Sequence, residues 1–194
     1  MTAQFPHTIA HGTGLWDIVG LSAGDLFHPS ELGLEPVYGR NTACWDGYLP
    51  SYEVRNGILE LQDLRIYVQG EPPVVAGVTP RRLPPTGVFD AHYEGLHYRI
   101  NYTGGILGGA GFIQELYVHM GYHPAWKYSR VVELLFNAGE LTQAHDRSRA
   151  IAEHRAHVLS TTSRDALHGM APDTKLDAWI EQAFSLSYEW PEEE

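Results

Sequence analysis

Four polar side chains on a predicted hairpin have the types and spacing that could support chemistry: Asp90, His92, His97 and Arg99. A two-residue turn at Glu94-Gly95 would place the two histidines opposite each other on neighbouring strands, with side chains about 5 Å apart. Imidazoles at that separation could share a proton or a metal ion. Asp90 could then orient one ring, and Arg99 could hold an anionic group. These four residues form the predicted catalytic site.

The same hairpin has a simpler interpretation, which is a solvated sheet face that is rich in histidine. A metal site needs at least a third ligand, and the hairpin alone does not supply one. If a metal ion is bound, the ligands are expected among His92, His97, His119 and His123. The sequence does not identify a cofactor.

A second group of candidate residues lies in the aromatic stretch from Tyr117 to Tyr128. Gly121 and Pro124 disfavour a continuous helix there, so we expect a strand that runs into an aromatic-walled loop. Loops of this kind often line binding sites. The alternative is a packing corner of aromatic rings. The predicted binding residues are His119, Tyr122, His123, Trp126 and Tyr128.

Three hairpins would position these groups. The segment Tyr52–Leu61 carries Asn56-Gly57, the preferred two-residue turn, and its register would put Tyr52, Val54, Leu59 and Leu61 on one face. The second hairpin turns at Glu94-Gly95, because that register separates apolar from polar residues. The third runs from Val131 to Thr142 through a three-residue loop, Asn137–Gly139. They predict a mainly antiparallel, curled or barrel-like sheet in an α+β protein.

Two regions rich in glycine or proline interrupt this pattern. Residues 70–87 hold five prolines and read as an extended connection between two β units. The glycine run Thr103–Gly111 is expected to mark a break, through a bend or a close approach of backbone. Residues 1–47 are expected to form short strands and loops.

Helices are predicted only near the end of the chain. Residues Asp146–Leu159 indicate a mostly exposed helix. A second, amphipathic helix is indicated by apolar residues spaced from Leu176 to Phe184, and it would cover an edge of the sheet. We therefore expect one domain over residues 1–194, with a β-rich core (1–145) and a helical covering segment (146–194).

Composition limits the functions to consider. The formal charge of −11 disfavours nucleic acid as a partner and suits a protein partner with a basic surface. The single cysteine, Cys44, excludes an internal disulfide and fits a reducing compartment. The first seven residues have no basic start or apolar run, and no stretch is apolar enough for a membrane helix. A cytoplasmic location is expected.

Part of the sequence resembles a motif of small bacterial proteins of unassigned function. The matching features are the stretch Tyr117–Tyr122 and the hairpin at Asn137–Gly139 that follows it. In those proteins an aromatic-Glu-x-x-x-Gly-x-Leu hairpin comes earlier, as Tyr52–Leu59 does here. The resemblance implies a shared β-rich fold and nothing about mechanism.

Two functional hypotheses follow. The first is a small cytosolic bacterial protein that binds another protein through an acidic surface with exposed Tyr and Trp, as an immunity or antidote protein would. The second is an enzyme or small-ligand binder that uses a cup in the curled sheet, with the histidines as general base or metal ligands.

Overall fold

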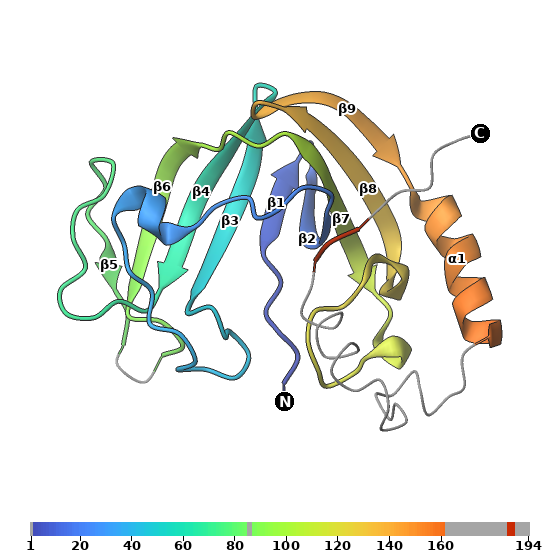
Figure 1. Cartoon of the computed structure of the whole chain (residues 1–194), viewed down its shortest axis with the longest axis horizontal. Coiled ribbons are helices and arrows are strands. Elements are labelled where there is room, and N and C mark those ends of the chain that lie inside the picture. The colour runs from blue at the N-terminus through green and yellow to red at the C-terminus, as the bar shows by residue number, and fades with distance from the viewer. Residues whose placement is uncertain (1, 85–86, 162–185, 189–194) are drawn as a thin grey trace.

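Nine strands form one mixed, mostly antiparallel sheet within residues 2–84, 87–161 and 186–188, which the computed structural model describes. The sheet has a ring-like arrangement (Figure 1), and one α-helix follows it in the described part of the chain. The fold class is confirmed as mainly β with a C-terminal helix. The strands are β1 (Thr8–His11), β2 (Gly14–Leu21), β3 (Tyr48–Arg55), β4 (Ile58–Ile66), β5 (Arg81–Arg82), β6 (Ala91–Arg99), β7 (Gly104–Phe112), β8 (Tyr128–Asn137) and β9 (Glu140–Asp146). The helices are α1 (Ser148–Thr161) and the 3-10 turns η1 (Pro29–Leu32), η2 (Gln114–Leu116) and η3 (Ala125–Lys127).

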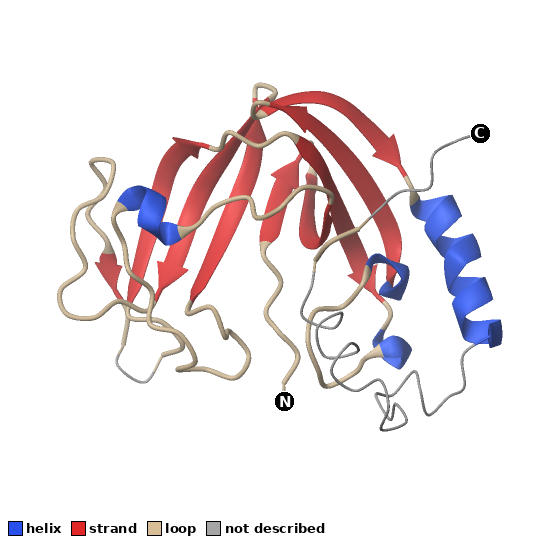
Figure 2. Cartoon of the chain, viewed as in Figure 1, coloured by secondary structure: helices blue, strands red, loops and turns tan. Residues whose placement is uncertain are grey.

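The strand order is β3-β1-β2-β7-β8-β9-β4-β6-β5, and a further pairing of β3 with β4 closes the ring. β4 and β9 meet at one residue pair, Ile58 with Glu140. There the turns of two hairpins lie together, since the Leu59 N–H donates to the Gly139 carbonyl over 2.9 Å. Figure 1 shows the strands converging at these turns and spreading toward the opposite end, which we call the wide end. Figure 2 shows that many loops and the short helical turns η2 and η3 lie toward the wide end.

Two of the three predicted hairpins are confirmed. In β3–β4, Val54 pairs with Leu59 and Tyr52 with Leu61, as the Asn-Gly turn predicts. Asn56 and Gly57 both have positive φ, as this turn type requires. The hairpin β8–β9 also forms. Its loop is two residues rather than three, because Asn137 pairs with Glu140.

The predicted hairpin at Glu94-Gly95 is wrong. Residues Ala91–Arg99 form one strand, β6, which pairs along β4. Gly95 and His97 do have positive φ, but they make a bulge where the register shifts between Leu61 and Asp63 of β4. The Asp63 carboxylate accepts the Gly95 N–H over 3.0 Å and so fixes the bulge. The left-handed residues therefore bend the strand and do not reverse it.

The glycine run does not break the sheet, since most of it forms β7 between β2 and β8. Neighbouring side chains, and not backbone as predicted, come close to Gly108 and Gly109. A methyl group on Gly109 would lie 2.7 Å from the Tyr128 ring, and one on Gly108 would lie 2.9 Å from Trp16 Cβ. Glycine is required here because these two side chains occupy the space of a Cβ.

Other segments agree only in part with the sequence predictions. The described part of the 70–87 segment is not a simple extended connection: it turns between Val75 and Val78, which form a bridge, and then contributes the short strand β5 beside β6. Residues 2–47 hold two strands and long loops, as expected. The first predicted C-terminal helix is α1, whereas the second lies outside the described residues. No helix in the described ranges is long and apolar enough to cross a membrane.

The main core fills the inside of the ring and draws on all the long strands. Its fully enclosed side chains include Ile9, Leu61, Tyr93, Ile106 and Leu134. A second apolar cluster joins Ile151 of α1 to β7 and β8 residues such as Leu107 and Val131. The helix therefore packs against the sheet from outside, as Figure 1 shows.

Candidate functional site

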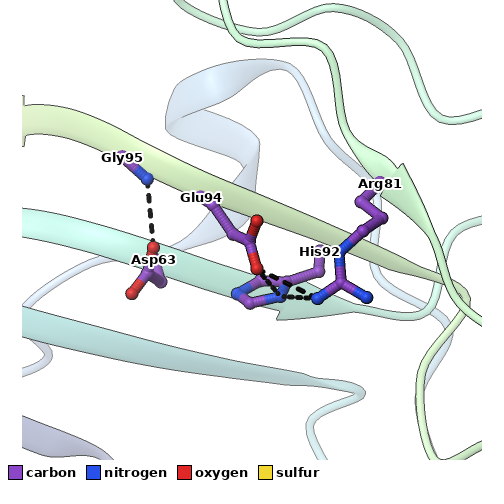
Figure 3. A network of polar contacts seen from close by, with 5 residues as sticks. All are labelled: Asp63, Arg81, His92, Glu94 and Gly95. Carbon is purple, nitrogen blue, oxygen red and sulfur yellow. Dashed lines mark hydrogen bonds and ion pairs between the residues drawn. The ribbon is translucent and has the colours of Figure 1, made fainter.

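The four predicted catalytic residues lie on or beside β6, and the structure does not bring them together. His92 and His97 belong to one strand, so the predicted cross-strand pair of imidazoles does not form. His92 is buried and contacts Arg81 and Glu94: its Nδ1 lies 3.1 Å from Arg81 Nη2 and 3.0 Å from Glu94 Oε1 (Figure 3). Burial lowers the pKa of His92, although the Glu94 carboxylate opposes that shift.

The side chains of Arg81, His92 and Glu94 form a triangle of contacts at one edge of the sheet. Arg81 Nη2 also donates to Glu94 Oε1 over 2.9 Å, which lowers the pKa of Glu94. Because Arg81 lies on the short strand β5, the three side chains connect β5 to β6. A neutral imidazole with its proton on Nε2 can accept from the guanidinium at Nδ1, so all three groups are paired without a bound molecule.

The other three residues of this group each have separate partners. His97 Nδ1 lies 3.3 Å from Glu60 Oε2. Asp90 forms an ion pair with Arg40 over 3.0 Å. Arg99 donates to Glu140 Oε1 over 3.3 Å. These residues therefore make separate polar contacts and do not form one site.

The histidines proposed as metal ligands are likewise dispersed. His119 accepts or donates a hydrogen bond with the Tyr117 hydroxyl over 2.9 Å, and His123 lies among aromatic rings. Among the described residues, no group of three or more His, Cys, Asp or Glu side chains is arranged to hold a metal ion.

The aromatic stretch forms a loop, as predicted, but without the expected strand at its start. β7 ends at Phe112, and residues 113–127 contain only the turns η2 and η3. The predicted binding residues in this loop point to different neighbours. His123 packs between Phe112 and Tyr117, with ring centroids 4.7 and 5.3 Å away. Tyr122 instead turns toward Asp46 and His7.

Tyr122 belongs to a group that the sequence analysis did not identify: His7, Asp46, Tyr48, Tyr52 and Tyr122, here called the tyrosine cluster. It lies at the wide end because β1 and β3 run parallel and start there, with Thr8 opposite Ser51. His7 directly precedes β1, and Tyr48 is the first residue of β3. A bridge between Ala3 and Gly121 brings the loop with Tyr122 to the same place.

The rings of the tyrosine cluster surround a polar centre. The His7 ring lies 6.1 Å from that of Tyr48 and 6.5 Å from that of Tyr122. Burial lowers the pKa of His7 to about 4, although its side chain is only half-buried. At neutral pH this imidazole is therefore uncharged and has both a donor and an acceptor.

The hydroxyl groups of the cluster are loosely bound. Tyr122 donates to Asp46 Oδ2, and Tyr48 donates to the Phe27 carbonyl, each over 3.5 Å. Ordinary O–H···O bonds are about 2.7–2.8 Å long. Tyr52 is buried, and no other described residue forms a hydrogen bond with its hydroxyl. Burial raises the pKa of Asp46, and Asp25 raises it further.

The sequence did contain a signal for part of this cluster. Tyr48, Pro50 and Tyr52 alternate as buried residues on β3, and His7 lies two residues before the buried Ile9. Inward-facing polar rings at the start of two strands mark the end of an apolar core. Nothing local connects positions 7, 46 and 122, which meet only through the topology of the sheet.

A third polar pair, Lys127 and His123, lies on the other side of the same loop. Lys127 is buried, with 6% of its surface exposed, and burial lowers the pKa of its amine to about 8. Burial also lowers the pKa of His123 to about 4, and the nearby Lys127 contributes to that shift. The sequence analysis did not single out Lys127.

Cys44 is part of the protein interior. It is buried, its thiol donates to the Tyr48 carbonyl over 3.3 Å, and burial raises its pKa to about 11. A thiol with such a pKa is a poor nucleophile at neutral pH.

Comparison with known proteins adds no relative. No protein-family model matches this chain, and neither a curated protein nor a solved structure does. Function is therefore argued from the geometry alone.

Proposed function

We propose that this protein binds a small organic cation, an amine or ammonium compound, at the tyrosine cluster on the wide end of its sheet. The observation that carries the proposal is the meeting of three rings, with His7 between Tyr48 and Tyr122, and the contact of the Tyr122 hydroxyl with the Asp46 carboxylate. This proposal develops the small-ligand hypothesis and moves it from the β6 histidines to a different set of residues.

Two physical features favour a cation. Aromatic faces attract positive charge, most strongly where water is excluded. Carboxylates add to that attraction: Asp25 and Glu31 both raise the pKa of Tyr52, which requires their negative charges to be close to it. No lysine or arginine contributes to the pKa shifts of Asp46, Tyr48 or Tyr122. A ligand ammonium would supply the missing positive charge.

The loose hydrogen bonds favour an exchangeable ligand. An ammonium group can donate to Asp46 and to a tyrosine hydroxyl at ordinary distances, which the present 3.5 Å contact does not reach. Replacing a long hydrogen bond by a charge-assisted one of ordinary length contributes to affinity.

Calorimetric titration with benzylamine and with benzyl alcohol, its neutral analogue, tests the proposal. Benzylamine should bind more tightly by about tenfold, the value of one charge-assisted hydrogen bond. Asp46→Asn should remove that preference. Glu71→Gln, which changes an exposed carboxylate paired with Arg82, is the matched control and should retain it. Equal affinity for the two compounds would contradict the proposal.

We propose as a second function the binding of a protein with a basic surface, as an antidote-like protein of the bacterial cytoplasm would do. Exposed aromatic side chains favour it: Phe5, Tyr38 and Trp45 are 40%, 56% and 58% exposed. Backbone hydrogen bonds from Phe5 to Ala43 and from Gly39 to Trp45, each 2.8 Å long, bring these three residues together. Aromatic residues on an acidic protein are typical anchors for a basic partner.

The test is the affinity of a candidate partner across salt concentrations. Affinity should fall as salt rises, and Trp45→Ala should weaken binding by about tenfold or more. Leu15→Ala removes an equally exposed apolar side chain from β2 and serves as the control. Salt-independent binding, or equal effects of both substitutions, would remove this function.

A further inference from the structure

The side chain of Lys127 is mostly buried, and its ammonium has no counter-ion among the described residues. No hydrogen bond or ion pair joins its ammonium to another residue in the described part of the chain, and burial is the one cause of its lowered pKa. The Lys127 Nζ lies over the Trp126 ring, 5.3 Å from its centroid. Asp and Glu number 24 against 13 Lys and Arg, so the missing partner is not explained by a shortage of acids.

The backbone that carries Lys127 is held firmly. Arg155 of α1 donates from Nε to the Trp126 carbonyl and from Nη2 to the Tyr128 carbonyl, each over 2.6 Å. The Lys127 carbonyl itself accepts the Ile113 N–H over 2.9 Å. Three hydrogen bonds thus fix the backbone of three consecutive residues, from which the mostly buried Lys127 side chain extends.

His123 is the second unpaired group. Both of its ring nitrogens are buried, and neither has a hydrogen-bond partner within the described ranges. Leaving a buried imidazole N–H unsatisfied costs about 1–3 kcal/mol. The Lys127 ammonium contributes to the lowered pKa of His123, so this charge lies near the His123 ring. A charged donor and a neutral donor therefore lie close together without acceptors.

We propose that His123 and Lys127 form a binding site for a small organic carboxylate. One carboxylate oxygen accepts from the Lys127 ammonium, and the other accepts from the N–H of His123. One positive charge matches one negative charge, which suits a carboxylate better than a phosphate dianion. This site is independent of the proposed cation site at the tyrosine cluster.

The walls of the site define the rest of the ligand. Phe112 and Tyr117 flank His123, and Trp126 flanks Lys127. Rings in these positions favour an aromatic or flat apolar body attached to the carboxylate. Tyr117 is 43% exposed, so this wall reaches the protein surface. The ligand class is therefore an aryl carboxylate, with benzoate as the simplest probe.

The first experiment compares benzoate with benzamide, which has the same shape and no charge, on the unmodified protein by calorimetry. Benzoate should bind at least about tenfold more tightly, and acetate should bind more weakly than benzoate because it lacks the ring. Equal affinity for benzoate and benzamide would overturn the proposal.

The second experiment observes Lys127 directly. The chain has two lysines, Lys127 and Lys175, so ¹³C-lysine labelling gives two Cε resonances, which Lys175→Arg assigns. Saturating benzoate should raise the titration midpoint of Lys127, because a bound anion favours the charged amine. No change in the Lys127 titration at saturating benzoate would show that any binding occurs elsewhere.

Variants complete the test. Lys127→Met and His123→Asn should each weaken benzoate binding by about tenfold or more while benzylamine binding stays unchanged. His145→Asn, on β9, is the matched control and should bind benzoate normally. Full benzoate affinity in Lys127→Met would overturn the proposal, and the direct titration decides the matter if that variant does not fold.

Discussion

Tyr122 and His123 are neighbours in one loop, yet they belong to regions of opposite electrostatic character. Tyr122 joins a cluster of phenols and carboxylates, in which burial raises the pKa of Asp46. His123 lies beside Lys127, where burial lowers the pKa of both groups. The first region would therefore be stabilised by a bound cation, and the second by a bound anion.

The comparison shows that pairing depends on position rather than on composition. On and beside β6, the charges of Asp90, Glu94 and Arg99 are paired at the surface, each with an oppositely charged side chain. The two buried regions leave groups unpaired, even though their desolvation is costly. Unpaired buried groups on a well-held backbone are where a bound molecule has most to contribute.

Removing the support of the basic region should have the largest effect. Arg155→Ala deletes two short hydrogen bonds to the Trp126 and Tyr128 carbonyls, so the free energy of unfolding should fall by about 2–3 kcal/mol. Urea denaturation measures the change, and benzoate affinity should drop while benzylamine affinity does not. Arg149→Ala changes an exposed arginine of the same helix and should cost less than about 0.5 kcal/mol. Equal losses in the two variants would contradict this account of Arg155.

Acid should weaken both regions through their histidines. The pKa values of His7 and His123 are about 4 in the folded protein, against about 6.5 in an unfolded chain. Between these values the unfolded state binds more protons, so stability should fall as the pH drops from about 6.5 to 4. We expect each histidine to contribute about 1–2 kcal/mol, allowing for partial exposure.

Urea denaturation over that pH range, on the unmodified protein and on His7→Gln and His123→Gln, separates the two regions. Each substitution should reduce the pH dependence by a similar amount. A dependence unaffected by His7→Gln would mean that its imidazole is not held neutral at the wide end.

Neutralising the buried lysine should stabilise the unliganded protein. Lys127→Met removes an unpaired charge and keeps most of the apolar stem, so we expect a gain of about 1 kcal/mol at pH 7. The gain should shrink as the pH rises from about 8 to 10.4, because the folded lysine loses its proton before the unfolded one. Lys127→Arg keeps the charge and should give no gain. A pH-independent effect of Lys127→Met would point to packing alone.

The smallest effect on stability is expected from Tyr122→Phe. Its hydroxyl lies 3.5 Å from Asp46, so its removal should cost less than about 0.5 kcal/mol while lowering the affinity for benzylamine. Tyr128→Phe is the matched case, because its hydroxyl donates to Asp17 over 3.1 Å and should contribute about 1 kcal/mol. Thermal unfolding compares the two, and a larger loss in Tyr122→Phe would reverse the assignment.

Local sequence patterns predicted the elements that local physics controls. The Asn56-Gly57 turn fixed the register of β3 with β4, and the end of α1 lies two residues beyond its predicted limit. β6 was misread because its bulge depends on the Asp63 carboxylate of another strand.

The candidate sites were harder to predict for the same reason. The aromatic loop was found from its composition, but the two directions of Tyr122 and His123 were not. The tyrosine cluster needs the parallel pairing of β1 with β3, which no short motif encodes. The burial of Lys127 could not be predicted, because lysine is usually exposed and no neighbouring residue indicates otherwise.

The glycines of β7 have a consequence for how this protein can change. The side chains of Trp16 and Tyr128 occupy the volume that Cβ atoms at Gly108 and Gly109 would take, so this part of the strand receives neighbouring side chains instead of contributing its own. In a saturation mutagenesis screen the positions with the least chemistry, such as Gly108 and Gly109, should tolerate the fewest replacements. A larger residue at position 109 would require a smaller residue at position 128. Residues 109 and 128 should therefore covary in sequences that share this fold.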